Sequence, residues 1–219
     1  MQLSEQEIVR RESLQKLREL GINPYPAEEF NKTATVKDIL EKFEAFDGKS
    51  VVIAGRLMSR RLMGKASFSE LKDSSGRMQI YINRDEIAPN EDKTLYNTVY
   101  KKLLDIGDII GVEGEVFKTK VGEPSILVKK LTLLTKSLRP LPVVKTDADG
   151  KVHDAFSDPE LRYRQRYVDL IVNDSVKDTF IKRTKITNSI RQFFNERDYL
   201  EVETPVLQPI PGGASARPF

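Results

Sequence analysis

The segment 55–65, GRLMSRRLMGK, gathers four cationic side chains and no acidic one. Phe68 follows in ASFSELKD, and Gln79 follows in RMQIYIN. Cations neutralise phosphates, an aromatic ring stacks on a nucleobase, and a side-chain amide both donates to and accepts from the edge of a base. These residue types at this spacing indicate a surface that holds and reads a single-stranded nucleic acid.

A less specific interpretation fits the same residues. Phe68 can be a core residue, Gln79 a solvated polar residue and the cations a solvated face, and composition alone favours this interpretation. Strand phase favours the opposite one, because successive side chains of a strand point to opposite faces. If Leu71 points into a core, Phe68 lies an odd number of positions away and faces outward on a regular strand.

The elements that position these residues are short stretches of alternating apolar and polar side chains between turn signals, which are typical of strands. A helix is expected at 92–105, where Leu95, Val99, Leu103 and Leu104 recur at helical spacing. It lies between the third and the fourth of five expected strands, which are 50–58, 66–73, 77–83, 108–119 and 125–135. This order predicts a five-stranded OB-fold barrel, which binds oligonucleotides on the face of its second and third strands.

The first 48 residues predict a helical extension. Ser4 and Glu7 stand at capping-box spacing at the start of a helix over 4–20. A second, short helix is expected with Thr35 as its cap. The apolar face of the first helix is expected to carry Ile8, Leu14 and Leu17.

The barrel is followed by a proline-containing, polar segment, 136–157, whose composition is typical of a linker. We interpret its His153 as a linker residue and not as a ligand. A helix is expected over 158–173, and a second one follows it with Asp174 or Ser175 as its cap.

A short strand over 200–207 is expected after the second of these helices. The residues after the linker are too few and too unpaired to bury a core of their own, so we expect the natural protein to continue past Phe219. The predicted fold is therefore mainly β plus α, with an incomplete α+β domain at its end. The expected domains are 1–48 for the helical extension, 49–135 for the barrel, 136–157 for the linker and 158–219 for the incomplete domain.

Composition bounds the possible functions. Hydrophobic residues make up 39% of the 219, and 36 Lys and Arg against 33 Asp and Glu leave a net charge of only +3, so a basic surface must come from local clustering. There is no cysteine and one histidine, which excludes disulfides and thiolate metal sites and disfavours a histidine-built one. No apolar run approaches the ~20 residues of a membrane span. These features predict a cytoplasmic protein without membrane association.

Several stretches resemble the lysyl-tRNA synthetases of class II, bacterial type. They are RRLMGKASFSELKD, SLRPLP, RYRQRYVDLI and IRQFFNERDYLEVETPVLQPIPGGASARPF. Aspartyl- and asparaginyl-tRNA synthetases share the same layout, but MGKASF, RYRQRY and PGGASARPF together are similar to the lysine enzyme. The resemblance implies an anticodon-binding OB barrel followed by the start of a class II catalytic domain.

The resemblance also implies roles for individual residues. In the family, the barrel binds the anticodon of the lysine tRNA, and the positions matching Phe68 and Gln79 engage its central uridine. Arg61 and Glu123 match further anticodon contacts. Three matches lie near the end of the chain: Gly212 matches a glycine that lines the lysine pocket, and Phe194 and Pro205 fall in motif 1, which builds the homodimer interface.

The family's activity needs lysine, ATP and Mg²⁺, and its motifs 2 and 3 supply the groups that hold ATP and Mg²⁺. Neither motif is found in these 219 residues, so we expect the chain by itself to bind no such cofactor and to be unable to activate lysine. Two alternatives stay open. One is a free-standing OB module that binds single-stranded nucleic acid without base specificity, and the other is a protein-interaction fragment that associates through its motif 1 helix.

Overall fold

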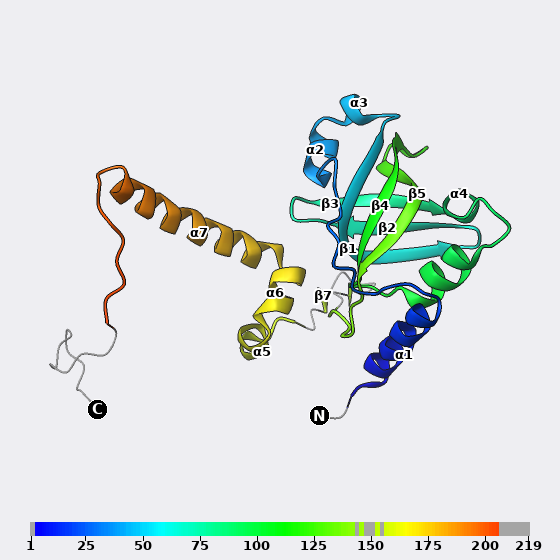
Figure 1. Ribbon diagram of the computed structural model, residues 1–219, viewed down its shortest axis with the longest axis horizontal. Helices are drawn as coiled ribbons and strands as arrows, with labels where there is room; N and C mark the ends of the chain where they lie inside the picture. The colour runs from blue at the N-terminus through cyan, green and yellow to red at the C-terminus, as the bar shows by residue number, and fades with distance from the viewer. Residues whose placement is uncertain (1–2, 143–144, 147–151, 154–155, 206–219) are drawn as a thin grey trace. The chain divides into compact units, whose positions relative to one another are not determined.

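The computed structural model describes residues 3–142, 145–146, 152–153 and 156–205. It divides into two compact units, Met1–Leu141 and Pro142–Phe219, each of which is described by itself. The first unit contains the expected barrel, and the second contains helices (Figure 1).

Five strands form a closed barrel in the order β1-β2-β3-β5-β4. The pairs are antiparallel except β3 with β5, which run parallel. The bounds are β1 Ser50–Met63, β2 Ala66–Lys72, β3 Arg77–Asn83, β4 Ile109–Lys118 and β5 Pro124–Thr135. The short helix α4, Arg84–Ile87, and the helix η1, Leu95–Leu103, stand between β3 and β4. The predicted five-stranded OB-fold barrel with a helix at this place is confirmed.

The first strand is longer than predicted. β1 pairs with β4 through its first half and with β2 through its second half, and its register shifts between Leu57 and Ser59. A bulge at this place bends the strand, so that one strand serves both neighbours. Residues 59–63, which were expected to lie between the first two strands, therefore belong to β1.

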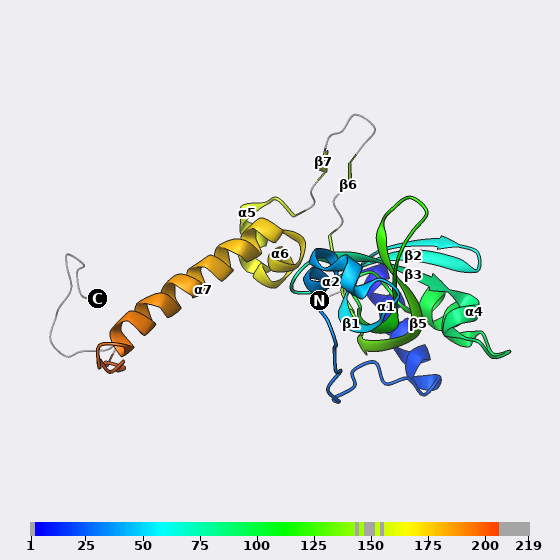
Figure 2. The ribbon, with the colours of Figure 1, turned by 90° about the horizontal axis from the view of Figure 1, so that it is seen from above.

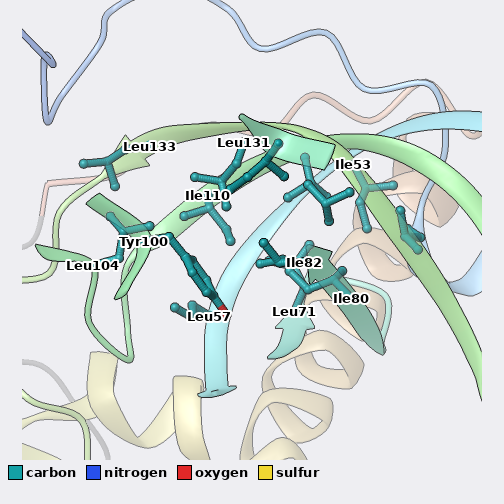
Figure 3. Close-up of a cluster of buried hydrophobic side chains, with 14 of the residues drawn as sticks. Ile53, Leu57, Leu71, Ile80, Ile82, Tyr100, Leu104, Ile110, Leu131 and Leu133 are labelled. Atoms are coloured by element: carbon teal, nitrogen blue, oxygen red, sulfur yellow. The ribbon is translucent and has the colours of Figure 1, made fainter. Parts of the chain in front are cut away.

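The barrel encloses an apolar core to which all five strands contribute. β2 and β3 bury every second side chain, as the period of a half-buried strand requires. Figure 3 shows part of this cluster, in which Tyr100 of η1 joins the strand residues Ile53, Leu57, Leu71, Ile80, Ile82, Ile110, Leu131 and Leu133.

The first helix, α1 (Glu5–Glu19), begins with the expected capping box of Ser4 and Glu7. Its expected apolar face is wrong in part, because Ile8 is 46% exposed. The buried positions include Arg10, whose guanidinium donates to three backbone carbonyls, those of Ser137 and Ile106 at 3.0 Å and that of Arg139 at 3.4 Å. These carbonyls satisfy the hydrogen-bonding groups of the buried guanidinium. The buried face of α1 therefore contains a charged residue and is not purely apolar.

Two short helices complete the extension. α2, Val36–Glu41, has the expected Thr35 cap, which forms a capping box with Asp38, and α3 spans Phe43–Phe46. A side chain from the β2–β3 turn also holds α2, since Asp73 Oδ2 accepts the Val36 N–H at 2.9 Å.

The second unit begins with two short strands, β6 (Lys145–Thr146) and β7 (Val152–His153), which pair antiparallel (Figure 2). The segment expected to be a linker thus contains backbone pairing at His153. The side chain of this residue lies outside the described part of the chain.

The helices of the second unit differ from the expected pair. The helix predicted over 158–173 is two helices, α5 (Pro159–Arg164) and α6 (Arg166–Val172), because Gln165 leaves helical geometry at φ −119° and ψ 52°. The long helix α7, Asp174–Asn195, follows (Figure 2). Its N-cap is Asn173 and not Asp174 or Ser175. The Asn173 side chain makes no cap hydrogen bond to α7, and its Nδ2 donates instead to Asp169 Oδ1 of α6 at 2.6 Å.

The strand predicted over 200–207 is absent from the residues of this range that the structure describes. Residues 200–205 are not in a strand, and residues 206 and 207 lie outside the described part. Isolated strands do not form without a partner, and the described residues of this unit offer no strand that pairs with this stretch.

Candidate nucleic-acid interface

The outer face of β2 and β3 carries the aromatic ring and the amide predicted to read a base. Leu71 is fully buried in the barrel and Phe68 is half-buried on the opposite face, which confirms the prediction from strand phase. Gln79 faces outward on β3, whose neighbours Met78 and Ile80 are buried. Strand alternation thus separates the core from a continuous outer surface.

Strand register brings the predicted residues together. Phe68 lies opposite Arg61 of β1 on one side and opposite Tyr81 of β3 on the other. Gln79 lies opposite Glu70 of β2. Directly opposed residues on neighbouring strands place their side chains on the same face, so these groups share one surface.

All four residues that the resemblance assigned to the anticodon line one pocket of about 150 Å³. β1 contributes Arg61, β2 contributes Phe68, β3 contributes Gln79, and the turn between β4 and β5 contributes Glu123. The remaining lining residues are Ser59, Ser69, Glu70, Arg77 and Met78. The pocket therefore offers a ring, an amide and both signs of charge within one small space.

The amide of Gln79 is held in a defined orientation. Its Nε2 donates to Ser125 Oγ at 2.8 Å, and that hydroxyl donates to the Glu123 carbonyl at 3.3 Å. Among the described residues, no other hydrogen bond involves this amide, so its oxygen and its second N–H are available to a ligand. A fixed amide with one free donor and one free acceptor can select one pattern on the edge of a base.

The four cations of segment 55–65 have different roles, so the prediction of one basic patch is only partly right. Arg56 donates to the Gly107 carbonyl at 2.6 Å, and burial lowers the pKa of its guanidinium while Asp108 opposes this. Arg60 donates to the Leu104 carbonyl at 3.0 Å. These two guanidinium groups satisfy backbone carbonyls of the barrel.

The other two cations of the segment face solvent. Arg61 and Lys65 are exposed, and within the part of the chain that the structure describes neither forms an ion pair. By contrast, Arg77 pairs with Glu70 at 3.1 Å at the other side of the pocket. The free positive charge of the interface therefore comes from the end of β1 and from the β1–β2 turn.

One aromatic residue of this surface was missed. The Tyr81 ring lies 4.9 Å from that of Phe68, tilted by 45°, and 6.2 Å from that of Phe117 on β4. The signal was available, because Tyr81 follows Gln79 by two positions and so shares its face. The ring of Phe68 thus rests beside a second aromatic side chain.

The remaining predicted residues lie in the second unit or outside the description. Phe194, at the end of α7, is 46% exposed, and its ring lies 5.5 Å from those of Phe193 and Tyr199. Pro205 is exposed and outside any helix or strand, and Gly212 lies outside the described residues. In the described ranges, no group of three or more His, Cys, Asp or Glu side chains lies where it could hold a metal ion.

Two family descriptions match the chain. Residues 51–134 match the OB-fold nucleic acid binding domain, and residues 158–219 match the class II tRNA synthetases of the D, K and N group. The first match covers the strands that carry the pocket, and the second covers α5, α6 and α7.

Similarity to curated proteins extends over the whole chain. A lysine–tRNA ligase from Christiangramia forsetii is 64% identical over 218 residues, which are 100% of this chain and 38% of that protein. The chain belongs to the lysyl-tRNA synthetase family. Its relatives in this family include lysine–tRNA ligases from Porphyromonas gingivalis, at 60% identity over 100% of the chain and 38% of the relative, and from Azobacteroides pseudotrichonymphae, at 61% over 99% and 43%.

The chain spans about two fifths of the length of these lysyl-tRNA synthetase relatives, and it corresponds to their amino-terminal portion. The barrel is the OB-fold domain of the family, and the helices that follow begin its class II domain. In the ranges that the structure describes, no helix is both long and apolar enough to cross a membrane.

Proposed function

We propose that the barrel binds the anticodon of the lysine tRNA through the pocket on β1, β2 and β3. The ring of Phe68 stacks on the central uridine, and the oriented amide of Gln79 bonds to the edge of that base. Arg61 and Glu123 flank it: Arg61 contacts a phosphate or the edge of a base, and Glu123 contacts a neighbouring base. The observation that carries this proposal is that all four residues line the same pocket.

The whole protein is proposed to be a lysine–tRNA ligase. It would join lysine to ATP as lysyl-adenylate and then esterify the terminal adenosine of the lysine tRNA, and Mg²⁺ would assist the step that uses ATP. The proposal rests on the identity of 60% or more to lysine–tRNA ligases over the full chain. The part described here would supply recognition of the tRNA.

The second unit is proposed to contribute to a homodimer and to the lysine pocket. The helix α7 exposes a series of apolar side chains that a partner subunit would cover, namely Phe180, Ile181, Ile186, Ile190, Phe193 and Phe194. Phe194 and Pro205 belong to this proposed interface, and Gly212 is proposed to line the lysine pocket. The division into 1–48, 49–135, 136–157 and 158–219 and the cytoplasmic location remain predictions.

Phe68→Ala tests the anticodon proposal. Base–aromatic stacking contributes about 1–3 kcal/mol per base, so the Kd for a uridine-rich anticodon stem-loop is expected to rise roughly 5- to 150-fold. Fluorescence anisotropy with the labelled stem-loop measures it. The control variant is Phe43→Ala, which removes a half-buried ring at the α3 end of the same unit.

The same measurement with a stem-loop of altered anticodon separates base reading from general binding. A base-reading pocket predicts a larger loss for the uridine-rich loop than for the altered one. An equal loss for both loops would support an OB module without base specificity, whose affinity follows charge and salt. No loss for either loop would refute a role of the pocket in binding.

A further inference from the structure

The inner face of β2 carries two serines where a barrel strand usually has apolar residues. Ser67 and Ser69 are buried, at 0% and 3% exposure, and they flank Phe68 in the chain. Each hydroxyl pairs with a buried tyrosine of η1: Ser67 Oγ lies 2.8 Å from Tyr96 Oη, and Ser69 Oγ lies 2.7 Å from Tyr100 Oη. Two buried hydrogen bonds thus hold the strand from below, on either side of the residue that faces the pocket.

The Tyr96 hydroxyl also bonds to the turn that precedes β2. It donates to the Gly64 carbonyl at 3.2 Å, at the tip of the β1–β2 hairpin. The side chain of Lys101, one position after Tyr100, reaches the same carbonyl at 3.3 Å. The helix therefore fixes the entry to β2 as well as its middle.

The helix that makes these contacts is itself held in place. Its hydrogen bonds include the wide i to i+5 step from the Leu104 N–H to the Val99 carbonyl, at 2.9 Å, which is the pattern of a π-helix. Arg60 of β1 donates to the Tyr100 and Leu104 carbonyls, and its guanidinium stands 5.5 Å from the centre of the Tyr100 ring. π-helical segments are rare and frequently occur at functional sites.

The burial of the Tyr96 and Tyr100 hydroxyls favours lasting hydrogen bonds to the two serines. Both rings are fully buried, and a buried phenol hydroxyl needs a partner, which the small serine side chains provide. Burial raises the pKa of the Tyr100 phenol above its ordinary value, so the hydroxyl keeps its proton at neutral pH. Core filling alone requires only the rings, since Phe would fill the same volume without the hydrogen bonds.

We infer that Tyr96 and Tyr100 are positioning residues for the RNA-binding face: through Ser67 and Ser69 they hold β2 so that Phe68 presents its ring at the angle needed to stack on a base. This inference rests on the proposed function of Phe68. The tyrosines touch no ligand and act from the opposite side of the strand.

Tyr100→Phe removes one hydroxyl and keeps the ring. In the full-length protein, the Kd for the uridine-rich anticodon stem-loop is expected to rise about three- to tenfold, a part of the loss caused by removing the Phe68 ring itself. The matched control is Tyr25→Phe, which removes a hydroxyl that donates to the Lys136 carbonyl at 3.0 Å, away from the pocket, and it should leave the Kd unchanged.

Two further variants separate positioning from stability. Ser69→Ala combined with Tyr100→Phe leaves no unpaired hydroxyl, so the melting temperature should recover while the Kd stays raised. In a Phe68→Ala background, Tyr100→Phe should add no further loss of affinity, because its effect passes through that ring.

The outcomes are distinct. If Phe68→Ala weakens binding but Tyr100→Phe changes only the melting temperature, or changes the Kd equally in both backgrounds, the positioning role is refuted and the proposed function stands. If Phe68→Ala has no effect, the proposed function fails and the positioning role fails with it.

Discussion

Replacing Lys136 by Met tests whether a buried ion pair holds the base of the barrel. Lys136 follows β5, and its side chain is fully buried. Its Nζ lies 2.9 Å from Asp108 Oδ2, also fully buried, and it bonds to Asp105. Met keeps an unbranched apolar side chain of similar length and removes the ammonium group, with its charge and its hydrogen-bond donors.

The expected cost follows from what the substitution leaves behind. The Asp108 carboxylate would retain the N–H groups of Asp105 and Ser137, at 2.8 and 2.7 Å, but would lose its ion pair. Breaking a buried pair by removing one partner costs about 3–5 kcal/mol. For a unit of about 150 residues this lowers the melting temperature by roughly 6–20 °C.

The dependence on pH gives a second prediction from the same variant. Burial raises the pKa of Asp108 above its ordinary 3.8, and the nearby Lys136 opposes this. Without the cation, the folded state keeps a proton that the unfolded state releases, so the stability of the variant falls as the pH rises above that value. The free energy of unfolding that the variant loses relative to the unsubstituted protein should therefore be small at about pH 4 and larger at neutral pH.

Urea unfolding followed by circular dichroism measures the deficit. Lys130→Met is the matched control, because Lys130 pairs with Glu113 at 2.8 Å but is 73% exposed, and such pairs contribute about 0–1 kcal/mol. A Lys136→Met deficit no larger than that of the control would show that burial of this pair is energetically unimportant. A deficit that does not change with pH would refute the assignment of the cost to the Asp108 carboxylate.

Two other substitutions test how the barrel is joined to its surroundings. Burial raises the pKa of Asp73, but hydrogen bonds led by that from the Val36 N–H lower it overall, below the ordinary 3.8. Asp73→Ala should therefore cost about 1–3 kcal/mol at neutral pH, and the cost should shrink as the pH falls below 3.8 through the lowered pKa, where the folded carboxyl takes up a proton; an equal cost in urea unfolding at neutral and acid pH would contradict this. Gly114→Ala would place a Cβ 2.2 Å from the Leu127 carbonyl oxygen, next to the register shift between β4 and β5. The free energy of unfolding in urea is expected to fall by about 1–3 kcal/mol. Unchanged stability would mean that the two strands can move apart without cost.

The outward face of β2 was predictable from the sequence because it depends only on parity. Once Leu71 is inside, Phe68 must be outside on a regular strand, whatever the rest of the fold does. The assignment of Gln79 to the same surface needs one more fact, the pairing of β2 with β3, which the short DSSG turn between them favours. Local rules therefore placed the ring and the amide correctly.

Local sequence rules could not predict the roles of Arg56, Arg60 and the η1 tyrosines. Arg60 bonds to carbonyls of Tyr100 and Leu104, 40 and 44 positions away, and no local pattern distinguishes it from the exposed Arg61 beside it. The helical period pointed to aliphatic residues as the buried face of 92–105, whereas the structure fully buries Tyr96 and Tyr100 as well. Long-range contacts and the π-helical geometry decide these positions.

Barrel closure has a consequence for how recognition can change. Since β1 to β5 form a closed ladder, the barrel does not bind an extended chain by adding it as a further strand. Discrimination between ligands must then reside in side chains on the outer surface, and alternation makes these side chains separate from those that hold the core. Under the proposed function, substitutions at outward positions such as Phe68 and Gln79 are expected to redirect binding to a different base while the backbone scaffold is kept, which would make this barrel suitable for engineered changes of anticodon preference.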